Sequence, residues 1–454
     1  MNDFFSEQGY DEMIEKLFVR FPSFQKSGAG AYKPGLSNME FFDQMAGHPH
    51  RNYRIIHLAG TNGKGSVSNM LASVFASEGI RTGLYTSPHI LDFRERMRII
   101  TDGGSELISK EYVWDFVRKW QDTFDHLDMS FFEITTVMAL NWFADRNVDL
   151  VVLETGLGGR LDSTNIVTPE LSVITNIGLD HCDLLGDTLP EIAFEKAGII
   201  KPKVPVVVGE SNPETDVVFE RKVLYTNISE PEFMGSRQTV MSLLTFADKV
   251  VPTLWDRHED ILEAMDLKGD YQRKNLRTVL AALDALGFIS DRNAGTVMQA
   301  IIHAASHTDF HGRWEKVSDN PLTICDIGHN EHGLRHNFAQ LERMKAEGTC
   351  SDLLIVYGSV ADKDVDSVIH LFPGDAVYIF TQADSRRALP AEVIRDKYLA
   401  WCSDAGHDPC ECHCIPSVAD AVKLARQLSI SRAAPLIYIG GSTYVVSEAC
   451  AVEM

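Results

Sequence analysis

A short apolar run that leads into a glycine-rich turn constrains this chain more than any other stretch. Residues 55–59 are mostly apolar and predict a buried strand, and apolar residues recur at helical spacing from Val67 to Phe75. The turn between them has the sequence Gly60-Thr61-Asn62-Gly63-Lys64-Gly65-Ser66. A strand, a glycine-rich turn and a helix in this order are the context that a phosphate-binding loop requires.

The residue types of this turn suit the phosphates of a nucleotide. Glycines let backbone N–H groups approach phosphate oxygens, and the helix N-terminus adds donors and partial positive charge. Lys64 would reach the outer phosphates, and Ser66 would place a hydroxyl near Mg²⁺. The spacing departs from the usual pattern, because Gly65 separates the lysine from the serine. An ordinary strand-to-helix turn is the alternative, but the flanking strand and helix favour a phosphate loop.

The composition is that of a globular protein and excludes several classes of partner. The chain has 454 residues, of which 44% are hydrophobic, so two or three domains are expected. A net charge of −22 disfavours a nucleic-acid partner, since phosphate backbones require a basic surface. No apolar run approaches the ~18 residues of a membrane helix, and the polar N-terminus lacks a signal peptide's apolar core. We therefore expect a cytoplasmic protein with free thiols and no membrane partner.

Three of the eight cysteines stand at alternate positions, Cys410, Cys412 and Cys414. Thiols one residue apart can chelate zinc, but structural zinc sites usually pair ligands two to four residues apart. No second half-site is evident, so we interpret this stretch as a loop and a strand without a metal.

Strands and helices alternate along most of the chain, which predicts a parallel, doubly wound α/β sheet. Strands are predicted at 82–86, 148–154, 171–176 and 204–208, and helices at 111–124, 131–147 and 190–198. A less regular stretch, 210–270, precedes a helix at 269–286. The alternation restarts with strands at 322–326, 353–357, 376–381 and 435–439. We expect an N-terminal domain over residues 1–307 and a smaller α/β domain over residues 313–454.

Polar residues follow several predicted strands, at the end where ligands of open α/β sheets gather. Ser87 follows one strand, and Glu154 ends another, which is the usual place for a Mg²⁺ ligand beside a nucleotide. His181 follows a third, where a hydrogen-bonded loop histidine is the alternative. Asp326 and His329 flank a strand end of the second domain and could face the phosphate loop across a cleft.

Two charged groups leave alternatives open. The stretch from Arg94 to Arg96 is either a solvated charge run or part of a site. Glu133 lies among apolar residues and is either a helix-start residue or part of a site.

Five blocks of the chain, 60–66, 86–98, 153–165, 175–201 and 312–333, resemble the folylpolyglutamate synthase and dihydrofolate synthase group of the Mur ligase superfamily. The resemblance implies an N-terminal ATPase domain and a C-terminal Rossmann-like domain. The sequence departs from the family's pattern at His311, Leu276, Glu331 and the pair Ile327-Gly328. Because the predicted ligands are retained, these departures affect local backbone geometry more than activity.

The resemblance also implies roles for particular residues. Lys64 and the loop amides would hold the ATP phosphates, and Ser87, Glu154 and His181 would be magnesium ligands. Lys196 matches a lysine that is carbamylated in the family and would support a second Mg²⁺. The remaining nucleotide contacts implied by the resemblance are Asn275, Arg313, Asp326 and His329, with Arg313 and His329 reaching the outer phosphates from the second domain.

The implied reaction is amide ligation through an acyl phosphate. A substrate carboxylate attacks the γ-phosphate of ATP, and the amine of L-glutamate then displaces phosphate. The expected cofactors are ATP and Mg²⁺, the expected substrates are L-glutamate and a folate or dihydropteroate, and a monomer is expected. One alternative is a Mur ligase acting on cell-wall precursors, against which Gly65 argues. The other is a nucleotide-binding switch, which would need neither Lys196 nor the second-domain residues Arg313 and His329.

Overall fold

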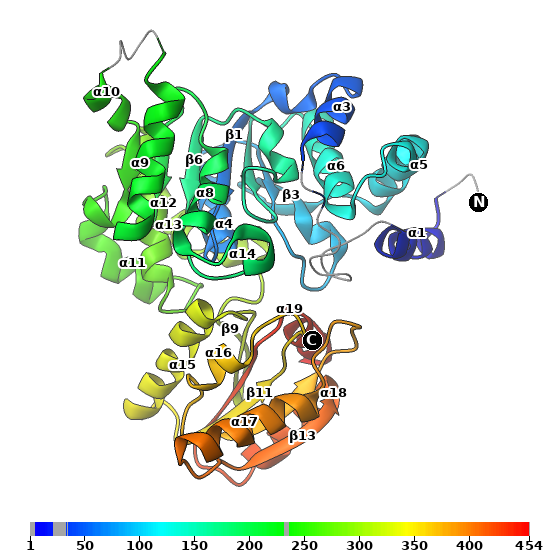
Figure 1. Cartoon of the computed structure of the whole chain (residues 1–454), viewed down its shortest axis with the longest axis vertical. Coiled ribbons are helices and arrows are strands. Elements are labelled where there is room, and N and C mark those ends of the chain that lie inside the picture. The colour runs from blue at the N-terminus through cyan, green and yellow to red at the C-terminus, as the bar shows by residue number, and fades with distance from the viewer. Residues whose placement is uncertain (1–4, 21–32, 34, 231–235, 454) are drawn as a thin grey trace. The chain divides into compact units, whose positions relative to one another are not determined.

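The computed structural model describes residues 5–20, 33, 35–230 and 236–453, and it divides into two compact units. The first unit contains Met1–Asp266 and Gln272–Phe310, and the second contains Leu267–Tyr271 and His311–Met454. Figure 1 colours the chain from blue at the N-terminus to red at the C-terminus, so the second unit runs mainly from yellow to red. In the described part of the chain, no helix has both the length and the apolar character that a membrane crossing requires.

An eight-stranded sheet forms the centre of the first unit, in the order β4-β3-β2-β5-β1-β6-β7-β8. The predicted parallel strands are present, as β1 (Arg54–Ala59), β2 (Thr82–Tyr85), β5 (Leu150–Glu154), β6 (Leu171–Ile174) and β7 (Val206–Val208). The predicted α/β architecture is therefore confirmed. The additional strands are β3 (Met97–Thr101) and β4 (Gly104–Leu107), which pair antiparallel, and β8 (Leu244–Phe246), which is parallel.

Helices cover both faces of this sheet. Helix α4 (Lys64–Ser77) packs on β2, β3 and β5, and α12 (Gln272–Ala285), α13 (Ala294–Ile302) and α14 (Ala304–Thr308) pack on α4. The side chains of Ile55 and Ala59 point to the opposite face, since they join the apolar clusters of that face. The helices with residues in those two clusters are α1 (Glu7–Arg20), α3 (Ser37–Met45), α5 (Lys110–His126), α6 (Phe131–Asp145), α8 (Leu189–Lys196), α9 (Pro213–Asn227) and α10 (Arg237–Met241).

The stretch 210–270 is more regular than its sequence suggested. It contains the 15-residue helix α9, which begins at Pro213 and is capped by Asn212, whose side chain accepts a hydrogen bond from the Glu214 N–H. Few of its residues are buried, so its apolar period is weak. The pair Asn212-Pro213, a cap followed by a proline at the first helical position, is therefore the sequence feature that indicates this helix. Among the described residues of the first unit, the remaining helices are α7 (Cys182–Leu185), α11 (His258–Ala264) and the short 3-10 helices η2 (Pro49–Asn52), η3 (Phe93–Arg96), η4 (Ser163–Ile166), η5 (Ala197–Ile199), η7 (Ala247–Lys249) and η8 (Trp255–Arg257).

The second unit is built on a six-stranded sheet in the order β13-β12-β11-β14-β10-β9. Only β9 pairs antiparallel with its neighbour among these strands. The strands are β9 (Glu315–Asp319), β10 (Leu322–Asp326), β11 (Asp352–Tyr357), β12 (Val377–Gln382), β13 (Cys412–Ser417) and β14 (Pro435–Gly440). The helices are α15 (Glu331–Ala346), α16 (Asp366–Ile369), α17 (Ala391–Ala405), α18 (Val418–Ser429) and α19 (Thr443–Glu453).

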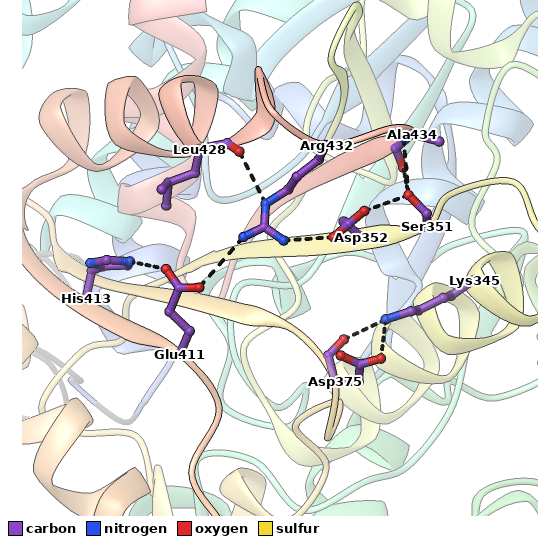
Figure 2. Close-up of polar contacts among 9 residues, drawn as sticks. All are labelled: Lys345, Ser351, Asp352, Asp375, Glu411, His413, Leu428, Arg432 and Ala434. Carbon is purple, nitrogen blue, oxygen red and sulfur yellow. Dashed lines mark hydrogen bonds and ion pairs between the residues drawn. The ribbon is translucent and has the colours of Figure 1, made fainter.

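Arg432 ties several elements together at the amino edge of this second sheet. Figure 2 shows its guanidinium between Asp352, at the start of β11, and Glu411, just before β13. The distance from Arg432 Nη1 to Asp352 Oδ1 is 2.8 Å, and Arg432 Nε donates to the carbonyl of Leu428 in α18. Asp326 ends β10 at the opposite, carboxyl edge. We therefore assign a structural role to the amino edge and look for ligands at the carboxyl edge.

Candidate functional site

The glycine-rich turn is held by the end of strand β6. Asn176 accepts hydrogen bonds from the N–H of Thr61 and of Asn62, through its main-chain and side-chain oxygens. The Thr175 hydroxyl donates to the carbonyl of Asn62 over 2.6 Å. Gly63 has a φ of 84°, in the left-handed region that favours glycine, and α4 begins at the next residue. The predicted order of strand, glycine-rich turn and helix is therefore present.

Two lysines meet on one carbonyl oxygen of this turn. Lys64 Nζ and Lys196 Nζ each donate to the carbonyl of Gly60 over 2.9 Å. Lys196, at the end of α8, is only 4% exposed. Burial, and after it the charge of Lys64, lower the pKa of Lys196 to about 7. The chain thus places a lysine that readily becomes a neutral amine beside the lysine of the turn.

Helix α12 supplies two amide side chains to the same place. Asn275 lies against Gly63, since a Cβ added to that glycine would be 2.4 Å from Asn275 Oδ1. The buried Gln272 receives a hydrogen bond from Asn275 Nδ2 and donates one to Ser66 Oγ over 3.2 Å. The structure therefore brings the predicted contacts Asn275 and Ser66 together through Gln272, which the sequence analysis did not identify.

The predicted magnesium ligands lie at the carboxyl ends of neighbouring strands. Glu154 ends β5 opposite Leu58 of β1, and it is 3% exposed. Ser87 follows β2, which pairs with β5 in parallel register. His181 follows β6, and its Nε2 lies 3.8 Å from Asp180 Oδ1. The first unit thus gathers Ser66, Ser87, Glu154 and His181 on adjacent connections of one sheet edge.

This donor set fits Mg²⁺. Among the residues that the structure describes, no group of three or more His, Cys, Asp or Glu side chains is arranged to hold a metal ion. Mg²⁺ does not need such a group, because it usually keeps several waters and binds through one or two carboxylates together with substrate phosphates. A buried carboxylate at Glu154, flanked by hydroxyls and a phosphate loop, suits that mode of binding.

Asp162 fixes the loop that follows Glu154. Its carboxylate accepts hydrogen bonds from the N–H of Gly156, Leu157 and Thr164 and from the Thr164 hydroxyl. Burial raises the pKa of Asp162, and its charge in turn raises the pKa of Lys196. Asp162 therefore holds the loop after β5 through several hydrogen bonds, and its charge acts on Lys196.

In the second unit, Asp326 is fully engaged by protein groups. Its buried carboxylate accepts hydrogen bonds from the Tyr271 hydroxyl, the N–H of Trp314, the N–H of Gly328 and Asn337 Nδ2. Burial and the neighbouring charge of Asp326 raise the pKa of Tyr271 well above its usual value. Asp326 thus joins the segment Leu267–Tyr271 to the loop that carries His329. Its role as a nucleotide contact remains a prediction.

His329 follows β10, and Arg313 precedes β9, whose first residue Glu315 pairs with Cys325 near the end of β10. His329 Nδ1 is 3.0 Å from the carbonyl of Ile327, so this nitrogen carries the proton in that hydrogen bond. Arg313 Nη1 donates to the carbonyl of Gly312 over 3.3 Å. Their predicted approach to the outer phosphates from the second unit remains a prediction.

The structure favours structural roles for the two ambiguous charged groups. Glu133 forms a capping box with Ser130 at the start of α6, which is the helix-start alternative. Glu95 accepts hydrogen bonds from three consecutive N–H groups, Ile90 to Asp92, and Arg96 is buried over the Phe131 ring. The stretch from Arg94 to Arg96 is therefore largely structural rather than a solvated charge run.

Replacing Gly63 with alanine is expected to raise the KM for ATP by about 10-fold, because the new Cβ would collide with Asn275. Gly79, at the other end of α4, offers a matched control, since it has a φ of 78° and no atom within 4 Å of an added Cβ. Gly79→Ala should lose about 1 kcal/mol of stability and keep its KM. Steady-state kinetics with thermal unfolding would separate the two variants, and an unchanged KM in Gly63→Ala would contradict this account.

The sequence is similar to Mur ligases in both units. Residues 58–283 match the family model of the Mur ligase middle domain, and residues 312–442 match the model of the Mur ligase glutamate ligase domain. A curated relative is the dihydrofolate synthase/folylpolyglutamate synthase of Bacillus subtilis (strain 168). It is 32% identical over 437 residues, which cover 92% of this chain and 94% of the relative.

Solved structures are similar over nearly the whole chain. The structure of E. coli FolC in complex with DHPP and ADP has a TM-score of 0.76 and 25% identity, and the match covers 98% of this chain and 97% of that one. The structure of Mycobacterium tuberculosis folylpolyglutamate synthase complexed with ADP has a TM-score of 0.79 and 26% identity, and the match covers 98% of both chains.

Proposed function

The chain belongs to the folylpolyglutamate synthase and dihydrofolate synthase group of the Mur ligase superfamily, and from this premise we propose that it joins L-glutamate to the carboxylate of a folate or dihydropteroate, with cleavage of ATP to ADP and phosphate. The observation that carries the proposal is the convergence of Lys64 and Lys196 on the Gly60 carbonyl, with the buried Glu154 at the end of the neighbouring strand. We further propose a cytoplasmic monomer, which sedimentation of the purified protein would check.

The first step transfers the γ-phosphoryl group. A carboxylate oxygen of the folate or dihydropteroate bonds to the γ-phosphorus, and the bond from that phosphorus to the β,γ-bridging oxygen breaks, giving an acyl phosphate and ADP. Helix α4 begins at Lys64, and its first backbone N–H groups would favour the negative charge of the phosphates. Lys64 would turn from the Gly60 carbonyl to the outer phosphates, where its charge stabilises the transition state.

The second step forms the amide. The neutral amine of L-glutamate attacks the acyl carbon, the carbon–oxygen bond to phosphate breaks, and the amine proton passes to solvent or to a nearby base. Arg313 would balance charge on the phosphate, and His329, with Nδ1 held by the Ile327 carbonyl, would present Nε2. Excluding water matters at this stage, because water hydrolyses an acyl phosphate.

Ser66, Ser87, Glu154 and His181 would hold Mg²⁺, which supplies positive charge against the phosphate oxygens. Lys196, as a carbamate, would add an anionic ligand for a second Mg²⁺. Gln272 fixes the orientation of the Ser66 side chain by donating to its oxygen, which leaves the other lone pair of that oxygen for a cation.

ADP release by the purified protein tests the proposed function directly. Release should require ATP, Mg²⁺, L-glutamate and either dihydropteroate or tetrahydrofolate, and the two pterin substrates should be assayed separately. Dependence on both the pterin carboxylate and glutamate identifies the ligase. ADP release that needs neither, or a requirement for a cell-wall precursor, would contradict the proposal.

Arg313→Ala and His329→Ala are each expected to lower kcat by about 100-fold, because each removes one charge or donor from the transferring phosphoryl group. The Kd of each variant for a non-hydrolysable ATP analogue should change by less than about 3-fold. Lys316→Ala is a suitable control, since this exposed lysine on β9 pairs only weakly with Asp319 at the surface. Wild-type kcat in both variants would remove the second unit from the chemistry.

A further inference from the structure

Arg98 is a buried arginine of β3 that binds the last turn of the first unit. Its side chain is almost fully enclosed, with 2% exposure. Arg98 Nη1 donates to the carbonyls of Thr308 and Asp309 over 2.6 and 2.7 Å. Arg98 Nη2 donates to the Thr86 hydroxyl over 3.3 Å, directly before the predicted metal ligand Ser87. One guanidinium therefore connects the ligand edge of the sheet to the end of α14.

The charge of Arg98 is retained in the interior. Burial lowers its pKa to about 10, and Glu95, Asp309 and Glu154 oppose that change. The guanidinium is therefore positive at neutral pH, and its hydrogen bonds to the two carbonyls are charge-assisted, which makes them stronger than neutral ones. Because Glu154 is one of the compensating charges, Arg98 also belongs to the electrostatic surroundings of the predicted magnesium site.

The segment that Arg98 holds is the last one before the chain enters the second unit for good, after the earlier short excursion of Leu267–Tyr271 into that unit. Helix α14 is fixed at its start as well, because the Asp266 carboxylate accepts hydrogen bonds from the N–H of Ala305 and Ser306. Asp309 then takes a left-handed φ of 55°, and the first unit ends at Phe310. Within the second unit, Glu315 accepts from the Gly312 N–H and Asp326 from the Trp314 N–H. Each unit thus holds its own side of the connection at Phe310 and His311 through hydrogen bonds within that unit.

We propose that Arg98 is a positioning residue, which fixes the final point at which the chain leaves the nucleotide-binding unit and thereby the delivery of Arg313 to the transferring phosphoryl group. This inference rests on the proposed function, in which Arg313 acts on that group. The inference follows from the short connection in sequence between the Asp309 carbonyl, which Arg98 holds, and Arg313. A displacement of Asp309 would therefore also displace Arg313. A displacement of about 1 Å at a reacting centre costs on the order of 100-fold in rate.

Hydrogen exchange tests the anchor without reference to activity. In Arg98→Met, amides of residues 304–312 should exchange about 10-fold faster or more, while those of the phosphate loop stay protected. Arg81→Met is a matched control, because Arg81 Nε also donates to a main-chain carbonyl, that of Arg146, at the other end of β2. Unchanged exchange over 304–312, or equal loosening of the phosphate loop, would overturn the proposal.

Kinetics then test the link to Arg313. Arg98→Met should lower kcat by about 100-fold with little change in the KM for ATP. Arg98→Lys keeps the buried charge, so this variant should fold, and its kcat should fall by about 10-fold. The double variant Arg98→Met/Arg313→Ala should be within about 3-fold of Arg313→Ala alone. Additive losses would mean that Arg98 does not act through Arg313. If Arg313→Ala alone is fully active, the role of Arg313 in the proposed function fails, and the exchange experiment alone decides whether Arg98 is an anchor.

Chemical rescue distinguishes an anchor from a general packing role. Arg98→Ala leaves a cavity shaped for a guanidinium ion, so guanidinium at non-denaturing concentration should raise its kcat by about 10-fold, whereas neutral urea of the same shape should not. Equal effects of the two compounds, or none, would contradict a charge-assisted anchor.

Discussion

Replacing Lys64 with methionine is expected to lower the rate of glutamate ligation by about 1,000-fold or more while leaving the fold intact. The loss follows from removing the positive charge that would stabilise the transferring phosphoryl group. The fold should persist, because the Gly60 carbonyl keeps its hydrogen bond from Lys196 and the turn remains attached to Asn176. Methionine also keeps most of the aliphatic side chain and is a good helix former at the start of α4.

Lys64→Met should have a second effect, on Lys196. The charge of Lys64 lowers the pKa of Lys196, so its removal raises that pKa and leaves less neutral amine at pH 7. Added bicarbonate should therefore restore only a minor part of the activity, since it cannot replace the charge at the phosphates. Measurements of kcat with saturating ATP, with circular dichroism as a check of folding, decide the outcome. A turnover near that of the parent protein would remove the glycine-rich turn from the mechanism.

The places of many candidate-site residues in the fold were predictable, because strand ends follow a general rule. Glu154 and Ser87 were identified from their places after apolar runs, and the sheet order puts both runs beside β1. Asn176 has the same signal, as it follows a predicted strand, and could have been found in the same way.

Other contacts depend on distant parts of the chain or on unusual burial. Gln272 reaches Ser66 across more than 200 positions of sequence, so no local pattern indicates it. Arg98 comes just after the charged stretch Arg94 to Arg96 and was not singled out, but the strand β3 begins at Met97 and takes the arginine into the interior. Asp326 was predicted as a nucleotide contact, and the sequence did not reveal that four protein groups bind its carboxylate. Polarity alone does not distinguish a ligand from an internal connector.

Lys196 is expected to be carbamylated in the active protein, and Lys196→Ala to lose about 100-fold or more of the ligation rate. The reason lies in the pair of lysines on the Gly60 carbonyl. Two ammonium groups on one oxygen repel each other, and the buried member loses its proton first. A neutral amine can add CO₂, with loss of one proton, to give an anionic carbamate. Repulsion from Lys64 then becomes attraction, and the new anion can hold Mg²⁺.

The pH dependence of this modification has a defined sign. Because the pKa of Lys196 is about 7, the neutral amine that reacts with CO₂ predominates above that pH and is lost below it. In bicarbonate-depleted buffer, activity should therefore fall as the pH decreases through about 7, and added bicarbonate should restore it. The same shift bears on stability. The folded pKa lies below the unfolded value of 10.5, so the unmodified lysine costs stability below that value, and the cost is complete below about pH 7.

Three measurements decide whether Lys196 carries the carbamate. Labelled ¹³CO₂ should give one carbamate signal in the parent protein that Lys196→Ala lacks. Lys201→Ala should keep it, and Lys201 is a fair control because it is also partly buried and donates to a main-chain carbonyl, that of Asn165. A small carboxylate such as acetate should restore part of the activity of Lys196→Ala by occupying the vacated anionic position, whereas an equal concentration of acetamide should not. Full activity of Lys196→Ala without any additive would exclude the carbamate, because the anion would then have no part in holding the metal or the phosphates.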